Sequence, residues 1–296
     1  RQFLNQAQPA EVCFSYSYGA RLPFRAAKNR GMSCILGQID PGPLEQDIVD
    51  VMTSRYAALK LDEAAPPQAY WEEWKEELEL ADQIVVNSAW SNELLIRQGV
   101  PAAKIRTIPL AYEVQEGCRP QESPSPGRAP KQPLTVLFLG QVILRKGVGQ
   151  LFDAIRMLKG APIRFVFAGP IGIKVPEDIR SNPSVQLLGP VNREQAIDLY
   201  GSSDVFILPT LSDGFAITQL EAMAYGLPVI ASRFCGEVVT DGLNGHILDE
   251  VSPEAIVGIL TGLIEDPDRL RLWNQNCGLD ERYSLSSLAG ALRALG

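Results

Sequence analysis

The chain has 296 residues, 46% of them apolar and 21% charged, which is the composition of a globular protein with room for about two domains. Acidic residues outnumber basic ones by 35 to 27, and the net charge of −8 makes nucleic acid an unfavourable partner. No apolar run approaches the ~20 residues that span a bilayer and no signal pattern is present, so membrane association is not indicated and we expect a cytoplasmic protein.

The histidine and cysteine content excludes several kinds of site. The chain has one histidine, His246, so a site that needs two imidazoles, such as the H-E-x-x-H zinc site, is impossible within it. His246 follows a turn and precedes an apolar run, where an edge position in a sheet is a simpler interpretation than a catalytic role. The five cysteines include no C-x-x-C pair, which predicts reduced thiols rather than disulfides or a thiolate metal site.

Residues 1–115 alternate short β-rich runs with helical patterns. Strands are predicted at 11–16, 33–37, 83–86 and 104–108, and helices at 20–30, 43–62, 68–80 and 90–98. Because strands that alternate with helices form parallel sheets, we expect a Rossmann-like domain here. Residues 116–132 are polar and rich in proline, which predicts an interdomain linker.

The alternation is more regular after this linker. Strands are predicted at 134–139, 163–168, 184–188, 204–208, 228–231 and 245–248, and helices at 147–158, 193–200 and 217–225. The strands are continuous apolar runs, as expected when helices cover both faces of a sheet. The sequence therefore predicts an α/β protein with a second Rossmann-like domain at 133–275 and a helical tail at 276–296.

Polar and glycine-containing loops follow the predicted strands of the second domain, at the sheet edge where such folds bind ligands. Gly140-Gln141 and then Arg145-Lys146 precede one helix, and the loop 209–216 precedes another. Two cations beside helix N-termini with free N–H groups form a cradle that suits a diphosphate. Asp213 lies in the second loop and Glu221 two turns further on, so one carboxylate can reach a sugar hydroxyl while the other accepts hydrogen bonds from a ribose diol.

These residues belong to a longer series of motifs in the second domain. The series is Gly140-Gln141-(x)3-Arg145-Lys146-Gly147, Gly169, Gly189-Pro190-Val191, Asp213-Gly214-Phe215 with Glu221-Ala222, and Gly226-Leu227-Pro228-Val229. In order and spacing it resembles glycosyltransferase family 4 over 134–250, with a weaker match at 81–88 and 104–109. The resemblance implies the GT-B fold and transfer of a sugar from a UDP- or GDP-sugar to an unidentified acceptor, with retention at the anomeric carbon. It also implies that no metal and no cofactor are needed.

Carried over by position, the resemblance gives each residue a role. Arg145 and Lys146 would neutralise the diphosphate and Asp213 would hold the donor sugar, which makes these three the catalytic residues. Glu221 would hold the ribose, and Val191 would meet the base through its backbone. The remaining nucleotide-sugar contacts would come from small groups and backbone N–H donors at Gly140, Gln141, Gly169, Gly214, Phe215 and Ala216.

The chain departs from the family pattern in several places. The family usually has Glu where Asp213 stands and often has Arg where Gln141 stands. The histidine that the family often places near the acceptor is absent, and either Gln38 or Asp40 stands near that place. The resemblance also implies that the start of the N-terminal acceptor domain is lacking, which a partner chain would then supply.

Two other hypotheses stay open. The chain could be a non-catalytic or degenerate nucleotide-sugar-binding subunit of a transferase complex. It could also catalyse another GT-B reaction, either epimerisation of a nucleotide sugar or phosphorolysis, although phosphorolysis needs a pyridoxal-bearing lysine and Lys159 is a poor candidate. Each motif alone is an ordinary surface feature, and it is their joint position on one sheet edge that favours a nucleotide-sugar site.

Overall fold

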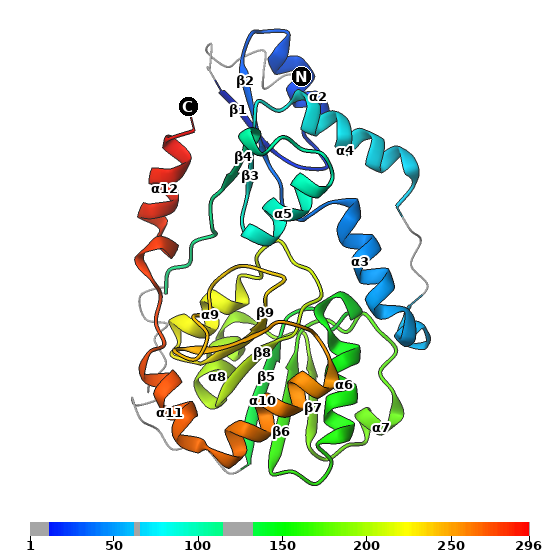
Figure 1. Cartoon of the computed structure of the whole chain (residues 1–296), viewed down its shortest axis with the longest axis vertical. Helices are drawn as coiled ribbons and strands as arrows, with labels where there is room; N and C mark the ends of the chain where they lie inside the picture. Colours follow the sequence, from blue (N-terminus) through cyan, green and yellow to red (C-terminus); the bar gives the residue numbers. More distant parts are fainter. Residues whose placement is uncertain (1–11, 62–65, 115–132, 296) are drawn as a thin grey trace.

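The computed structural model describes residues 12–61, 66–114 and 133–295, which form two α/β domains, each built on a parallel sheet (Figure 1). This architecture confirms the predicted fold class. The predicted linker at 116–132 lies outside the described residues. Within the described residues, no helix is long and apolar enough to cross a membrane.

The first domain is built on a four-stranded sheet with the strand order β1-β2-β3-β4. Its strands are β1 (Val12–Tyr16), β2 (Ser33–Gly37), β3 (Gln83–Val86) and β4 (Ile105–Thr107). Its helices are α2 (Arg21–Lys28), α3 (Pro43–Thr53), α4 (Gln68–Leu80) and α5 (Ala89–Arg97), with 3-10 turns η1 (Ser54–Leu59) and η2 (Ala102–Lys104). The four predicted strands are confirmed to within two residues at each end.

The helix predicted at 43–62 is shorter in the structure. The α-helix ends at Thr53 and continues as the 3-10 turn η1, in which Tyr56 has the non-helical angles φ −104° and ψ 18°. This kink turns the Tyr56 ring into the hydrophobic core of the second domain. A contact with a distant part of the chain therefore interrupts a pattern that is locally helical.

The second domain is built on a six-stranded sheet with the order β10-β9-β8-β5-β6-β7. Its strands are β5 (Leu134–Leu139), β6 (Ile163–Ala168), β7 (Val185–Gly189), β8 (Val205–Leu208), β9 (Val229–Ser232) and β10 (Gly245–Leu248). Its helices are α6 (Val148–Met157), α7 (Glu177–Arg180), α8 (Arg193–Ser202), α9 (Thr218–Ala224), α10 (Pro253–Glu265) and α11 (Pro267–Gln275), with 3-10 turns η3 (Leu144–Lys146) and η4 (Glu281–Tyr283).

The sheet of the second domain is buried on both faces. Along β5, Val136 and Phe138 enter one core cluster and Leu137 enters the cluster on the opposite face. The strand order reverses at β5, which has β6 on one side and β8 on the other. Loops that leave the carboxyl ends of strands at such a reversal diverge to opposite faces, and the crevice between them is where open α/β sheets bind ligands.

The last helix, α12 (Leu285–Arg293), returns to the first domain. Its Leu288 and Ala291, with Leu295, pack against Ile35 and Val85 of β2 and β3. The Gln83 side chain also donates a hydrogen bond of 2.8 Å to the carbonyl oxygen of Leu295. Figure 1 shows the red C-terminal helix beside the first sheet rather than on the second domain. Part of the predicted helical tail at 276–296 is thus a covering layer of the first domain.

The segment formed by α3 and η1 links the two domains. The Tyr56 ring lies where a Cβ on Gly149 of α6 would be only 2.6 Å away, and the Tyr56 hydroxyl donates a 2.8 Å hydrogen bond to Asp153. The Lys174 N–H donates a 2.9 Å hydrogen bond to the carbonyl oxygen of Leu59. One end of this segment therefore belongs to the first domain and the other is anchored in the second.

Candidate functional site

Three glycines bring the carboxyl ends of β5, β6 and β7 together. The Gly169 N–H donates a 2.8 Å hydrogen bond to Gly189, and a Cβ on Gly169 would lie 2.0 Å from the carbonyl oxygen of Gly140. Gly140 and Gly169 have φ values of 151° and 132°, which side chains rarely allow. Close backbone approach at this edge requires glycine and leaves the space above the strands free of side chains from these positions.

Hydrogen bonds join the loop after β5 to the loop after β8. The Arg145 carbonyl oxygen accepts a 2.8 Å hydrogen bond from the Leu211 N–H and a 3.2 Å hydrogen bond from the Thr210 hydroxyl. Gly147 has φ 71°, and a Cβ there would lie 1.8 Å from the carbonyl oxygen of Pro209. The two loops therefore have little freedom relative to each other, which fixes the cations of the first near the acid of the second.

Arg145, Lys146 and Asp213 form one charged cluster. Lys146 forms an ion pair with Asp213, and an Arg145 guanidinium nitrogen lies 3.4 Å from the same carboxylate oxygen and 2.9 Å from the Ser212 carbonyl oxygen. Burial alone would raise the pKa of Asp213, but the two cations outweigh it and hold that pKa below its usual range. Asp213 is thus an ionised hydrogen-bond acceptor at the sheet edge.

The backbone after Asp213 offers unused N–H groups. The Phe215 N–H donates a 3.2 Å hydrogen bond to Asp213, whereas the N–H groups of Gly214 and Ala216 donate none to any of the described residues. Ala216 has φ 64°, a strained value for a residue with a side chain. The Phe215 ring is 3% exposed and packs on Tyr283, so this residue contributes backbone and core contacts.

Glu221 lies on α9 and faces α8. Its carboxylate accepts a 2.8 Å hydrogen bond from the Tyr200 hydroxyl. Burial raises the pKa of Glu221, with Tyr200 and Arg193 acting in the opposite direction. Because Arg193 is the first residue of α8 and Val191 stands two residues earlier, the positions predicted for the ribose and the base lie near each other.

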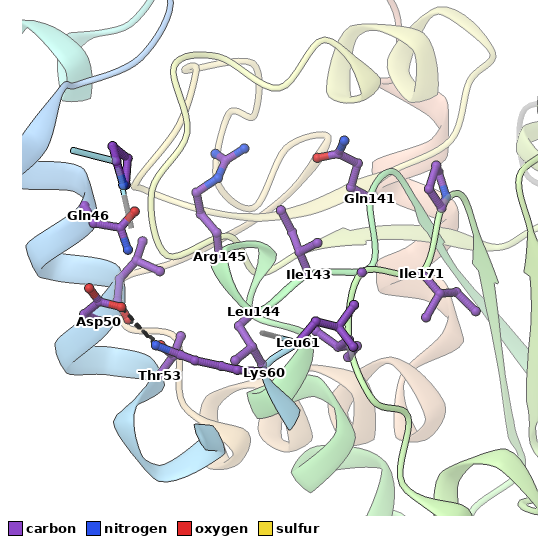
Figure 2. A pocket seen from close by; sticks show the side chains of 15 residues that line it. Gln46, Asp50, Thr53, Lys60, Leu61, Gln141, Ile143, Leu144, Arg145 and Ile171 are labelled. Atoms are coloured by element: carbon purple, nitrogen blue, oxygen red, sulfur yellow. Dashed lines mark hydrogen bonds and ion pairs between the residues drawn. The ribbon is translucent and has the colours of Figure 1, made fainter. Parts of the chain in front are cut away.

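A pocket of about 660 Å³ lies between α3–η1 of the first domain and the loops after β5 and β6 (Figure 2). Asp50 and Lys60 are joined by a 2.9 Å ion pair on its first-domain wall. Gln141 and Arg145 contribute to its second-domain wall, but Lys146, Asp213 and Glu221 do not line it. The pocket therefore adjoins the charged cluster without enclosing it.

The first domain contributes residues that the sequence analysis missed. The Trp90 side chain donates a 2.8 Å hydrogen bond to the Ser212 hydroxyl, and a Cβ on Gly214 would lie 2.0 Å from the carbonyl oxygen of Ile39. Glu45, in the first turn of α3, lies 3.8 Å from Arg145. The sequence held no distinctive signal for Glu45, because an acidic residue in the first turn of a helix is common.

The two residues considered for the acceptor-side position occupy different surroundings. Gln38 is 1% exposed, and its side-chain amide bonds to Trp74 and to the backbone of Asp40. Asp40 accepts a 2.5 Å hydrogen bond from the Tyr18 hydroxyl, and its Cα would be 3.6 Å from a Cβ on Gly214. Asp40 therefore reaches the second domain, whereas Gln38 holds its own loop in place.

One acidic pair outside the charged cluster has a structural role. Asp266 and Asp268, separated by Pro267, stand at the start of α11, where Asp266 accepts a 3.4 Å hydrogen bond from the Arg269 N–H and Asp268 pairs with Arg271. Figure 1 shows α11 at the end of the second domain away from the first. This acidic pair is therefore a helix cap distant from the charged cluster.

The two domains and the cleft between them define the class of protein: this is a GT-B fold. Residues 121–277 match the family of glycosyl transferases group 1, and because the match covers more than half of the chain, the chain belongs to that family. The finer assignment to family 4 stays a prediction.

Similar proteins agree with this assignment. The chain is 26% identical over 247 residues to a D-inositol 3-phosphate glycosyltransferase from Xylanimonas cellulosilytica, covering 77% of this chain and 59% of that protein. It is 24% identical over 198 residues to an uncharacterized 41.2 kDa protein in the cps region of Klebsiella pneumoniae, covering 66% of this chain and 54% of that protein. The chain thus spans between half and two thirds of the length of these relatives.

Solved structures share the fold of this chain over nearly all of its length. Anabaena HepE in complex with UDP aligns with a TM-score of 0.72 at 14% identity, covering 99% of this chain and 80% of that one. A sucrose-phosphate synthase from Thermosynechococcus elongatus aligns with a TM-score of 0.75 at 18% identity, covering 99% and 75%. At these identities the likeness establishes the fold alone.

Proposed function

We propose that the chain carries the donor site of a retaining, metal-independent glycosyltransferase that moves a hexose from a UDP- or GDP-sugar to an acceptor. The observation that carries the proposal is the cluster of Arg145, Lys146 and Asp213 at the reversal point of the second sheet. Two cations and an ionised acid, beside the unused N–H groups of Gly214 and Ala216, match the polarity of a sugar diphosphate.

The chemistry follows from where charge develops. When the bond between the anomeric carbon and the diphosphate breaks, the electron pair stays on the leaving oxygen, and negative charge accumulates there. Arg145 and Lys146 stabilise that charge more strongly than the charge of the ground state, which lowers the barrier. In this proposal the diphosphate replaces Asp213 as the ion-pair partner of Arg145 and Lys146. The ionised Asp213 then accepts hydrogen bonds from the donor sugar. Two fixed cations can supply the charge that a metal ion supplies in other transferases.

The rest of the donor would extend toward β7. Glu221 would accept hydrogen bonds from the ribose, with its orientation fixed by Tyr200. The base would lie near Val191 and the Gly169–Gly189 hydrogen bond. HepE has been solved with UDP and with UDP-glucose, which makes a uridine nucleotide the first choice to test on this chain.

The proposal is tested by titrating the purified chain with UDP, GDP and ADP, with and without EDTA. We expect one nucleotide to bind with an affinity that EDTA leaves unchanged. In Lys146→Ala the affinity should fall by about 10- to 100-fold, because a buried charge partner of the diphosphate is lost. Lys159→Ala is the matched control, since Lys159 is exposed and lies outside the cluster.

Binding in all variants alike would place the nucleotide elsewhere on the protein. No binding to any of the three nucleotides would contradict an intact donor site and would favour a degenerate subunit instead. Loss of binding on addition of EDTA would contradict the metal-independent mechanism.

A further inference from the structure

Glu45 is a carboxylate of the first domain that is buried against the cations of the second. Its side chain is 13% exposed and lies 3.8 Å from an Arg145 guanidinium nitrogen. Its Oε1 atom is buried and has no hydrogen-bond partner among the described residues. A buried carboxylate oxygen without a donor is costly, so its persistence calls for an explanation.

The ion pair with Arg145 is a loose one. The same guanidinium nitrogen already donates a 2.9 Å hydrogen bond to the Ser212 carbonyl oxygen and lies 3.4 Å from Asp213. Glu45 is thus the most distant of three acceptors around one nitrogen, and it is the only one of the three that comes from the other domain. Because the Glu45 contact is the longest of the three, Arg145 can replace it with a contact to another anion without any rearrangement of the loops after β5 and β8.

Electrostatics oppose the simultaneous presence of Glu45 and a diphosphate at Arg145. Burial raises the pKa of Glu45, Arg145 and a hydrogen bond with the Ser212 side chain oppose that effect, and the negative charges of Asp40 and Asp213 add to it. A diphosphate would bring at least two further negative charges to the same cations. Like charges at this range in a partly buried site repel strongly.

We propose that Glu45 competes with the diphosphate for Arg145 and so promotes release of the nucleoside diphosphate after sugar transfer. This inference rests on the proposed function. Before the donor binds, Glu45 shares Arg145 with Asp213. The donor's diphosphate displaces Glu45, and after transfer the carboxylate returns to Arg145 and weakens the hold on the product. Product release is a common slow step in enzymes whose sites close around the substrate.

The experiment compares UDP binding to the full chain and to Glu45→Gln by calorimetry and by stopped-flow displacement. Because the substitution keeps the shape and removes the charge, we expect the dissociation constant to fall by about three- to tenfold, mainly through slower dissociation. A residue with a merely structural role would weaken binding or leave it unchanged. Glu45→Asp, which keeps the charge but shortens its reach, should show a smaller gain in affinity.

Two controls separate competition from general electrostatics. Asp47→Asn removes the same charge from the same helix at an exposed position, and it should leave the affinity for UDP within about twofold. In an Arg145→Ala background, Glu45→Gln should no longer tighten binding, because the group for which it competes is absent.

The outcomes distinguish this inference from the proposed function. If the wild-type chain binds no nucleotide, the proposed function fails. If it binds UDP and Glu45→Gln binds with equal or lower affinity while its thermal unfolding is unchanged, the competition is refuted. Should Glu45→Gln fail to fold, Glu45→Asp, measured alone and in the Arg145→Ala background, decides the question by the same comparison.

Discussion

The pKa values of the buried Asp213 and the half-buried Glu221 are displaced in opposite directions. The cations Arg145 and Lys146 overcome the effect of burial at Asp213, whereas at Glu221 the Tyr200 hydrogen bond does not. The lowered pKa means that ionised Asp213 stabilises the fold above its unfolded pKa, and that this contribution is lost as the pH falls through the folded value. The raised pKa means that protonated Glu221 stabilises the fold below its unfolded pKa, and that this contribution is lost as the pH rises through the folded value.

A pair of neutral substitutions should therefore have opposite effects on stability. At pH 7, Glu221→Gln should raise the unfolding temperature, because the ionised carboxylate is disfavoured where it is buried, while Tyr200 keeps an acceptor. Asp213→Asn should lower the unfolding temperature, because Arg145 and Lys146 lose their counter-charge. Thermal scans at pH 7 and pH 4 check both signs, and the benefit of Glu221→Gln should shrink at the lower pH.

Nucleotide affinity tests the predicted role of Glu221 independently of its effect on stability. Despite its higher stability, Glu221→Gln should bind nucleotide about tenfold more weakly, because an amide oxygen accepts hydrogen bonds less strongly than a carboxylate. A Glu221→Gln variant with higher stability and unchanged nucleotide affinity would show that Glu221 does not contact the nucleotide. Burial would still explain its raised pKa.

At the scale of elements, the loops after β5 and β8 behave as one unit because of Gly147. This residue needs both a positive φ and the absence of a side chain, since a Cβ would collide with the Pro209 carbonyl oxygen. Gly160, three residues after the end of α6, has φ 89°, but a Cβ there would have no atom within 4 Å. Both positions would therefore strain the backbone of a residue with a side chain, and only at position 147 would that side chain also collide with another atom.

The comparison of Gly147→Ala with Gly160→Ala isolates that collision. Gly160→Ala should cost about 1 kcal/mol, from the positive φ alone. Gly147→Ala should cost about 3 kcal/mol or more and should also weaken nucleotide binding, because relief of the collision moves Lys146 away from Asp213. Urea unfolding and nucleotide titration of both variants test this. Equal losses of unfolding free energy and of nucleotide affinity in the two variants would show that the contact between Gly147 and Pro209 contributes to neither.

At the scale of the whole molecule, the first domain is assembled from two distant parts of the chain. Leu288 and Ala291 of α12 complete a small core with Ile35 of β2 and Val85 of β3. This face of the first sheet is covered by the last helix rather than by the helices that alternate with its strands. The stability of the first domain should therefore depend on residues that follow the second.

Leu288→Ala should reveal this dependence. We expect a loss of about 1–2 kcal/mol, below the cost at a fully buried leucine because Leu288 is only partly buried. Hydrogen exchange should accelerate in β2 and β3 more than in β5 and β6. The control is Leu285→Ala on the same helix, where the side chain is 50% exposed and the expected change is within about 0.5 kcal/mol. Uniform acceleration in both sheets would contradict local coupling.

Features of the fold that depend on a local sequence pattern can be predicted from the sequence. The strands were found because they are short apolar runs between turn residues, and the positions of Arg145, Lys146 and Asp213 followed from the rule that parallel strands end at one edge. Their roles in catalysis stay predictions. The contributions that depend on contacts between domains had no local signal: the kink at Tyr56, the burial of Glu45, and the return of α12 to the first sheet.

The path of α12 has a consequence for how the protein is made. β4 ends at Thr107 and α12 begins at Leu285, so the strands of the first sheet leave the ribosome about 180 residues before their covering helix. At about 5–20 residues per second, that face waits on the order of 10–35 s for its partner. The second domain has its strands and their covering helices within 134–275, and Tyr283 of η4 completes its core just before α12 begins, so this domain can finish folding first. The part synthesised first is thus the part completed last, and in the interval its uncovered apolar face is open to chaperones and to aggregation.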